Sequence, residues 1–243
     1  MAKRLWICLS VLAMMLLPAR AEIIVVAVSG TDEIAPGTRL ASGQSISLPE
    51  GARLTLLSQA GEMQVLEGPY SGEPTAKNGT STQNTDAASW SAVLALVGDP
   101  DARSDVMGAS RVTDGAFMVP PSIWHISVDS SGPRCTLPDT VALWRRDAGQ
   151  GTDVSIRSSA GRLTDVVWPA KEHMFSLPNE FAADGRLMVS IDSELRELTL
   201  IVAPEDLRQA GPGAVFTWLM EHKCQRQALA LIERVHAGLS LTD

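Results

Sequence analysis

The chain has 243 residues and carries 28 acidic against 20 basic side chains, which gives a formal charge of −8 at pH 7. An acidic surface repels phosphate backbones and anionic lipid, so the composition argues against nucleic-acid binding and against peripheral membrane binding. The length is ample for one large or two modest domains with a real hydrophobic core.

The N-terminal segment, residues 1–21, is typical of a cleavable secretory signal peptide. Two basic residues precede an apolar run over 5–17, and the small-x-small triplet Ala19-Arg20-Ala21 follows. This order predicts cleavage between Ala21 and Glu22. An uncleaved anchor is the alternative, but the run is shorter than the roughly 20 residues that a spanning helix needs. We expect a periplasmic or secreted protein with no stable membrane insertion after cleavage.

Two cysteines, Cys135 and Cys224, remain after the predicted cleavage because Cys8 lies within the signal. An even count in an oxidising compartment predicts a Cys135–Cys224 disulfide, and two buried free thiols are the alternative. In the chain-entropy model, a bridge across this span stabilises the fold by about 4 kcal/mol. It would tie the C-terminal helix to the preceding β region.

Short apolar runs alternate with Gly and Pro turns over 22–71, which is typical of an all-β domain. The runs fall at 23–28, 45–48, 54–57 and 63–66, with turns such as Pro36-Gly37 and Pro49-Glu50-Gly51 between them. We expect a small barrel or sandwich of five or six strands.

This first β domain resembles the FecR-like family. The resemblance is carried by Gly37 to Gln44, by the strand region from Ile46 to Leu57, and by Val65-Leu66-Glu67-Gly68-Pro69. The best-known members hold this domain in the periplasm behind a membrane span and a cytoplasmic sigma-regulating segment. This sequence shows neither feature. The resemblance therefore implies a β scaffold like that of exported bacterial proteins, but neither sigma-factor regulation nor iron–citrate sensing.

A linker with one short helix is expected over 72–118. Residues 71–89 are rich in Ser, Thr, Gly, Asn and Ala and nearly free of large apolar side chains, which predicts a loop. Trp90, Val93, Leu94 and Val97 fall at helical spacing before Gly98-Asp99-Pro100, which predicts a short docking helix.

The β pattern resumes over 119–203, where seven short apolar runs separated by turns predict an immunoglobulin-like sandwich. A true antibody-type domain is not predicted, since the Cys…Trp…Cys spacing is missing. Over 204–243 the period becomes helical: a turn near 205–209 precedes one long helix over 214–235, with Cys224 on its apolar face. The predicted fold class is mainly β: two small β modules with a C-terminal helix.

The sequence contains no nucleophile, metal or cofactor motif. G-x-S-x-G, S-x-x-K and H-E-x-x-H are all missing, and a triad would have to assemble from distant positions. His222 and Cys224 are too few ligands for a zinc site. Among the tryptophans, Trp124, Trp144 and Trp218 are predicted to lie in the core, whereas Trp168 is predicted to be exposed at an interface because it precedes Pro169 at a strand end.

These observations favour an exported, non-catalytic binding protein of the bacterial envelope, with an envelope protein as partner and a place in a periplasmic sensing or signalling assembly. The alternative is an enzyme or small-ligand receptor acting on cell-wall material, which predicts a pocket with convergent polar groups. A structural accessory protein is a third hypothesis that the sequence does not separate from the first.

Overall fold

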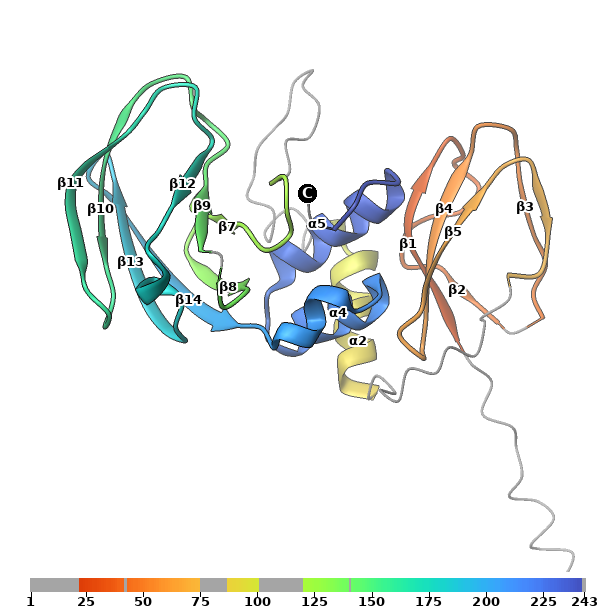
Figure 1. Cartoon of the computed structure of the whole chain (residues 1–243). Helices are drawn as coiled ribbons and strands as arrows, with labels where there is room; N and C mark the ends of the chain where they lie inside the picture. The colour runs from red at the N-terminus through yellow and green to blue at the C-terminus, as the bar shows by residue number, and fades with distance from the viewer. Residues whose placement is uncertain (1–21, 42, 75–86, 101–119, 140, 242–243) are drawn as a thin grey trace, which may run out of the picture.

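The computed structural model describes residues 22–41, 43–74, 87–100, 120–139 and 141–241. The predicted signal over 1–21, with Ala21, lies outside these residues, and so does most of the expected linker. Figure 1 shows a β module at each end of the molecule, with the helices between the two modules. No helix within the described residues is long and apolar enough to cross a membrane.

The first module is built from short antiparallel strands: β1 (Ile23–Ser29), β2 (Arg39–Leu40), β3 (Ile46–Leu48), β4 (Arg53–Ser58), β5 (Met63–Glu67) and β6 (Tyr70–Gly72). Four of them form a sheet in the order β2-β1-β4-β5, and β3 pairs with β6. The predicted strands in this region are confirmed, because each alternating apolar run buries residues in the module's core.

The second module contains two sheets that enclose one apolar core. Its elements are β7 (Ile126–Ser127), β8 (Gly132–Thr136), β9 (Ala142–Trp144), β10 (Thr152–Arg157), β11 (Arg162–Trp168), β12 (Met174–Ser176), the 3₁₀ turn η2 (Asn179–Phe181), β13 (Gly185–Ile191) and β14 (Glu194–Val202). The sheet orders are β11-β10-β13-β14-β8 and β12-β9-β7. The immunoglobulin-like arrangement is not confirmed, since β8 pairs with β14, and β7 with β9, in parallel, whereas that fold is antiparallel.

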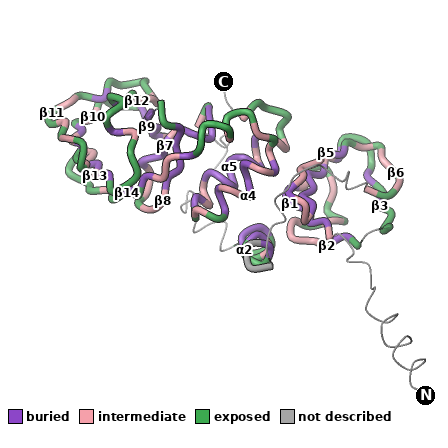
Figure 2. The backbone as a smooth tube through the Cα atoms, turned by 60° about the horizontal axis from the view of Figure 1, so that its bottom comes forward, coloured by how far each residue is buried: buried purple, intermediate pink, exposed green. Residues whose placement is uncertain are grey.

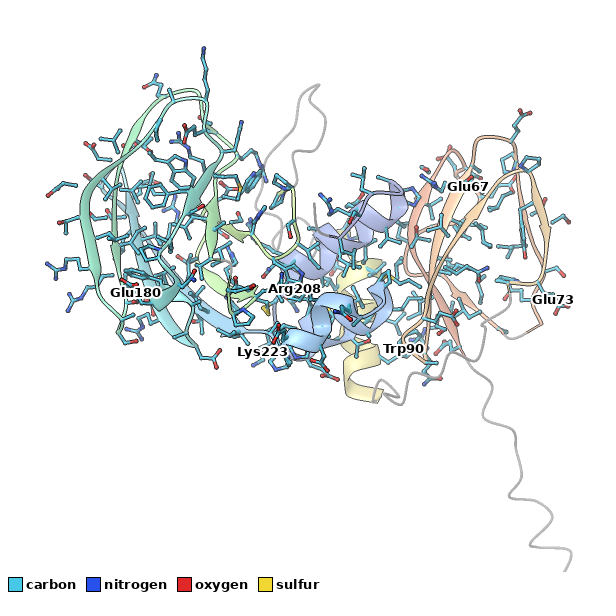
Figure 3. All side chains as sticks on the ribbon, in the orientation of Figure 1. Glu67, Glu73, Trp90, Glu180, Arg208 and Lys223 are labelled. Atoms are coloured by element: carbon cyan, nitrogen blue, oxygen red, sulfur yellow. A yellow bond between two sulfur atoms is a disulfide. The ribbon has the colours of Figure 1, made fainter. Side chains whose placement is uncertain are left out.

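The helical layer consists of α2 (Ala87–Gly98), the 3₁₀ turn η3 (Glu205–Gln209), α4 (Pro212–Glu221) and α5 (Gln225–His236). The prediction of one continuous helix over 214–235 is wrong. The chain turns between α4 and α5 at Lys223, which has a left-handed φ of 61°, and the Cys224 N–H bonds back to the Leu219 carbonyl. Lys223 lies at this turn in Figure 3.

Strand β1 is buried on both faces, and this joins the first module to the helices. Ile23 and Val25 belong to the module's own core, while Ile24 and Val26 belong to the core shared with α2, α4 and α5. Figure 2 shows these buried segments facing one another. The approach is close where α4 begins: a Cβ on Gly213 would lie 1.6 Å from the Gly61 carbonyl oxygen, so only glycine fits there.

Trp90 of α2 adds a polar contact at the same boundary. Its indole N–H donates to the Glu22 carboxylate over 2.9 Å, and Glu22 also pairs with Arg39 at 3.3 Å. Figure 3 shows Trp90 between the helices and the first module. Glu22, the residue that follows the predicted cleavage site, is therefore held in place on the folded protein.

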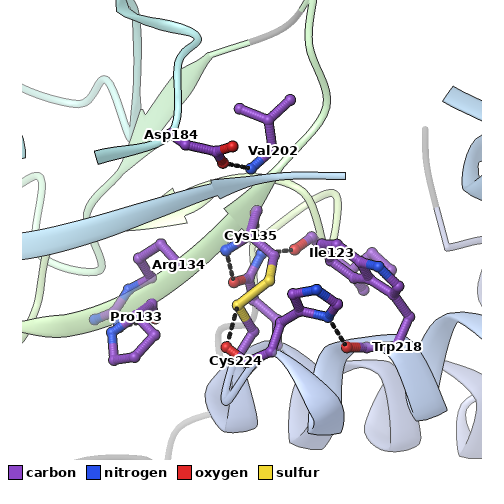
Figure 4. The surroundings of a disulfide bond; sticks show 10 residues. Ile123, Pro133, Arg134, Cys135, Asp184, Val202, Trp218 and Cys224 are labelled. Carbon is purple, nitrogen blue, oxygen red and sulfur yellow. Dashed lines mark hydrogen bonds between the residues drawn. A yellow bond between two sulfur atoms is a disulfide. The ribbon is translucent and has the colours of Figure 1, made fainter. Parts of the chain in front are cut away.

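The predicted Cys135–Cys224 disulfide is present, with a Cα–Cα distance of 6.0 Å (Figure 4). It joins β8 of the second module to the start of α5, and both cysteines are fully buried. The Gln227 side chain reinforces the same junction: its carbonyl oxygen accepts the Cys135 N–H at 2.7 Å, and its amide nitrogen donates to the Cys135 and Ile123 carbonyls, each at 2.6 Å.

His236, at the end of α5, links the helical layer to the first module. Its Nδ1 lies 2.9 Å from the Thr55 hydroxyl of β4, and its Nε2 lies 2.9 Å from the Ser29 hydroxyl of β1. Burial lowers the pKa of His236 below its ordinary 6.5; Arg53 lowers it further and Glu233 acts in the opposite direction. The folded protein therefore favours the neutral imidazole more strongly than the unfolded chain does.

We predict that His236 makes stability pH-dependent. As pH falls through about 6.5, the unfolded chain takes up the proton before the folded one, so the stabilisation present above that pH is lost. His236→Gln keeps groups that bond both hydroxyls but does not titrate. Urea unfolding between about pH 7.5 and about pH 5 should show a steeper loss for the wild type than for H236Q. Parallel profiles would contradict this assignment.

Candidate functional site

A cleft of about 630 Å³ opens at one end of the second module. Three chain segments supply its walls: the residues after β7, the loop between β9 and β10, and the β13–β14 hairpin. Its lining residues are Val128, Asp129, Arg145, Asp147, Gly149, Gln150, Thr152, Ile191, Asp192, Glu194 and Arg196. Most of them are polar or charged, which sets the cleft apart from the mostly apolar pockets of small-molecule sites.

Arg145 is the most buried charged group in this lining, with only 4% of its surface exposed. Its Nε donates to the Glu172 carbonyl at 3.1 Å, Nη1 to the Thr152 hydroxyl at 2.8 Å and Nη2 to the Pro169 carbonyl at 2.6 Å, with a weaker bond to the Trp168 carbonyl at 3.5 Å. The guanidinium also stacks 4.8 Å above the Trp168 ring. Arg145 therefore holds several loop segments together beneath the cleft.

Burial lowers the pKa of Arg145, and the nearby carboxylates of Asp147, Asp192 and Glu172 act in the opposite direction. A guanidinium nevertheless stays a cation in proteins. The positive charge at the base of the cleft is thus fixed, and it faces carboxylates without a direct ion pair to any of them within the described residues.

The negative side of the cleft comes from Asp129, Asp147 and Asp192, which we call the cleft aspartates. Asp129 accepts the Arg146 N–H at 3.2 Å, and Asp147 accepts the Gly149 N–H at 2.8 Å. Asp192 lies in the two-residue turn between β13 and β14, where φ is positive at both central positions, as a type I′ hairpin turn requires. Backbone N–H groups therefore orient the Asp129 and Asp147 carboxylates, and the hairpin turn fixes the backbone at Asp192.

Charge in the cleft is unbalanced. Glu194 pairs with Arg196. The three cleft aspartates form no ion pair within the described part of the chain. Asp147 and Asp192 act electrostatically on Arg145, whereas Asp129 acts on the neighbouring cations Arg134 and Arg226. Like charges gathered around a partly enclosed space attract an oppositely charged group. Two exposed carboxylates, Asp147 and Asp192, thus face Arg145 across this part of the cleft.

Trp168 does not lie at an interface, so the prediction of an exposed Trp168 is wrong. Its side chain is fully buried, between the Arg145 guanidinium and the Phe175 ring, whose centroid lies 5.5 Å away. The following proline ends β11 but does not turn the indole outward. Trp124 and Trp144 are buried as predicted, and Trp218 is half-buried and stacks on His222.

The structure also brings a serine hydroxyl and an imidazole together, at Ser29 and His236. In a nucleophilic site, a third group, normally a carboxylate, orients the base. Here that position is taken by the Thr55 hydroxyl. We interpret the three side chains as the contact that fixes α5 to β1 and β4.

The groups that line the cleft are carboxylates, guanidinium groups, an amide and a hydroxyl. No Ser, Cys or His is among its lining residues. Among the described residues, no group of three His, Cys, Asp or Glu side chains is placed to hold a metal ion. Cys224, which the sequence sets beside His222, is bonded to Cys135.

Sequence reasoning did not identify the cleft. Its charged residues come from three separate loops, where aspartates also serve as ordinary turn formers, as Asp147 and Asp192 do. The sequence held one signal for a charged site here: Arg145-Arg146-Asp147 directly follows an apolar strand. A cation beside a buried strand must find hydrogen-bond acceptors.

No protein-family model, no curated protein and no solved structure matches this chain. The geometry of the site and the chemistry of its residues therefore carry the functional argument.

We predict that Arg145 is required for the stability of the cleft. Arg145→Met should lower the free energy of unfolding by about 3 kcal/mol, because buried carbonyls lose their charged donor. Arg196→Met is the matched control at the same cleft: it removes a partly exposed ion pair and should cost under about 1 kcal/mol. Denaturant unfolding measures both, and equal losses would contradict the role assigned to Arg145.

Proposed function

We propose that this protein is an exported, non-catalytic binding protein of the bacterial cell envelope, and that its recognition site is the cleft of the second module. The observation that carries the proposal is the cleft itself: a polar, charged space whose lining holds carboxylates and guanidinium groups but no Ser, Cys or His. A site of this kind offers charges and hydrogen-bonding groups to a complementary ligand.

Export is supported by the signal-like N-terminus and by the Cys135–Cys224 bridge, since disulfides persist in oxidising compartments. The resemblance of the first module to FecR-like domains and the immunoglobulin-like character of the second remain predictions. Together they favour a scaffold in a periplasmic sensing or signalling assembly. In this scaffold the helical layer fixes the second module, which carries the cleft, to the first module.

A receptor for a small polar ligand is the second candidate function. It is favoured by the size of the cleft, because 630 Å³ falls within the range of about 300–1,000 Å³ typical of small-molecule sites. The tryptophans do not supply a sugar-binding platform within the described residues, since four of them are buried and Trp218 stacks on His222. This leaves polar and charged ligands rather than stacked sugar rings.

Intact-mass spectrometry of the protein recovered from the envelope tests export and the disulfide together. We expect a mass that begins at Glu22 and that gains two hydrogen atoms on reduction. Unreduced samples provide the internal control. A full-length mass with free thiols would rule out the proposed compartment.

Site-specific photo-crosslinking tests the binding function. A photoreactive residue at Gln150, which is exposed in the cleft wall, should capture a discrete partner, whereas the same residue at exposed Glu205 should not. The partner, once identified and purified, should lose most of its affinity for a Gly149→Trp variant, in which the new side chain obstructs the cleft. Equal capture from both positions, or unchanged affinity for G149W, would contradict the proposal.

A further inference from the structure

Three arginines from separate elements gather where the second module meets the helical layer, and we call them the arginine cluster. They are Arg134 of β8, Arg146 just after β9, and Arg226 in the first turn of α5. Arg134 directly precedes Cys135, and it lies beside the disulfide in Figure 4. Arg226 comes two residues after Cys224, the other end of that bridge. The bridge therefore holds the backbones of β8 and α5 together at these two arginines.

Asp129 is the acidic side chain beside the cluster. Its carboxylate accepts the Arg146 N–H and the Ser127 hydroxyl, each at 3.2 Å. The Ser127 carbonyl in turn accepts a hydrogen bond from Arg134 Nε at 2.8 Å. The charge of Asp129 also acts on Arg226. Three positive charges and one negative charge thus meet here, which leaves the cluster with a net charge of +2.

The three guanidinium groups differ in how far the fold satisfies them. Arg134 has only 2% of its surface exposed and donates to three backbone carbonyls, none of which carries a charge. Arg146 and Arg226 are half-buried, and neither guanidinium forms a hydrogen bond or an ion pair within the described residues. A cation that loses water without gaining acceptors is destabilised. These two side chains can therefore take acceptors from a ligand.

The pKa values show the same lack of negative charge. Burial lowers the pKa of Arg134 to about 10, Arg226 lowers it further, and Asp129 acts in the opposite direction. Burial also lowers the pKa of Arg226, which Asp129 raises and Arg146 lowers. In addition, α5 carries no acidic residue in its first turn, where a cation is unfavourable because of the helix dipole. An anion at this place would reduce each of these costs.

We propose that the arginine cluster binds a doubly charged oxyanion of the phosphate class, as the free ion or as a phosphate monoester, against Arg146 and Arg226. A phosphate group carries a charge of about −1.5 to −2 near pH 7, which matches the cluster better than the single charge of a carboxylate. Guanidinium groups suit phosphate oxygens because they donate two parallel bonds. This inference goes beyond the proposed function, since it concerns a small ligand at α5 rather than the partner of the cleft.

The acidic character of the whole chain decides the size of the ligand. Exposed charges farther away than about 8 Å are largely screened at physiological ionic strength, so the formal charge of −8 does not prevent binding of a small anion. A phosphate polymer, in contrast, would bring its further phosphates against an acidic surface. The ligand is therefore small, and it contacts both the second module and the helical layer.

Thermal unfolding in the presence of inorganic phosphate measures the binding, because a ligand of the folded state raises the unfolding temperature. We expect about 20 mM phosphate to raise it by at least about 2 °C relative to chloride of equal ionic strength. Glycerol 3-phosphate is the second arm. A larger rise than with phosphate would assign the site to a monoester, and an equal or smaller rise would assign it to the free ion.

Variants separate binding from the general stabilising effect of phosphate salts. Arg226→Gln should weaken the apparent phosphate affinity about tenfold, because a charged donor is lost. Arg146→Gln should do the same, and it keeps the Asp129 bond because the backbone N–H makes it. The matched control is Arg162→Gln, an exposed arginine at the start of β11, whose affinity should stay within about twofold. It lies at the opposite edge of the sheet from β8, roughly 19 Å away at the usual strand spacing.

Two results would overturn the inference. The first is an unfolding temperature that neither phosphate compound raises above the chloride value. The second is an equal response to phosphate in the wild type, R226Q and R146Q, which would reduce the rise to a general salt effect. Because R226Q and R146Q change different elements, failure of one variant to fold leaves the other to decide.

Discussion

The fold depends on how α5 is fixed to the free edge of β8. A strand at the edge of a sheet presents unpaired N–H and carbonyl groups, which must find partners when they are buried. At Cys135 the Gln227 side chain supplies both partners, as a neighbouring strand would, and the disulfide to Cys224 adds a covalent restraint. Because α5 also contacts β1 and β4 through His236, this junction relates the second module to the first.

The apolar core and the charged loops of the second module occupy separate parts of it. The apolar core between its two sheets supports the strands, and the loops at their ends carry the charges. Arg145 links the apolar core to the charged loops. Its guanidinium lies on the core residue Trp168, and its charge acts on the carboxylates of Asp147 and Asp192. A rigid scaffold that positions polar loops is a common arrangement for binding proteins.

Strands with alternating apolar residues were predictable because burial of one face leaves a period of two in the sequence. Strand β8 was missed because it reads Gly-Pro-Arg-Cys-Thr, without that period. Arg134 is buried there and donates to the Ser127, Ser130 and Pro133 carbonyls, so tertiary contacts override its polarity. The break between α4 and α5 was missed for a related reason: both helices continue one apolar face, and the turn at Lys223 depends on contacts to Leu219 and Cys135.

The cleft could not be predicted, because no local pattern records which loops meet in space. The disulfide could be predicted, because only two cysteines remained to pair after the expected cleavage.

The central helices belong to neither module alone, and the sequence patterns gave no sign of this. The helices share one apolar core with Ile24 and Val26 of the first module and with Cys135 and Leu137 of the second. Separation of the modules would expose apolar surface on each fragment, so each module depends on the central helices for part of its burial.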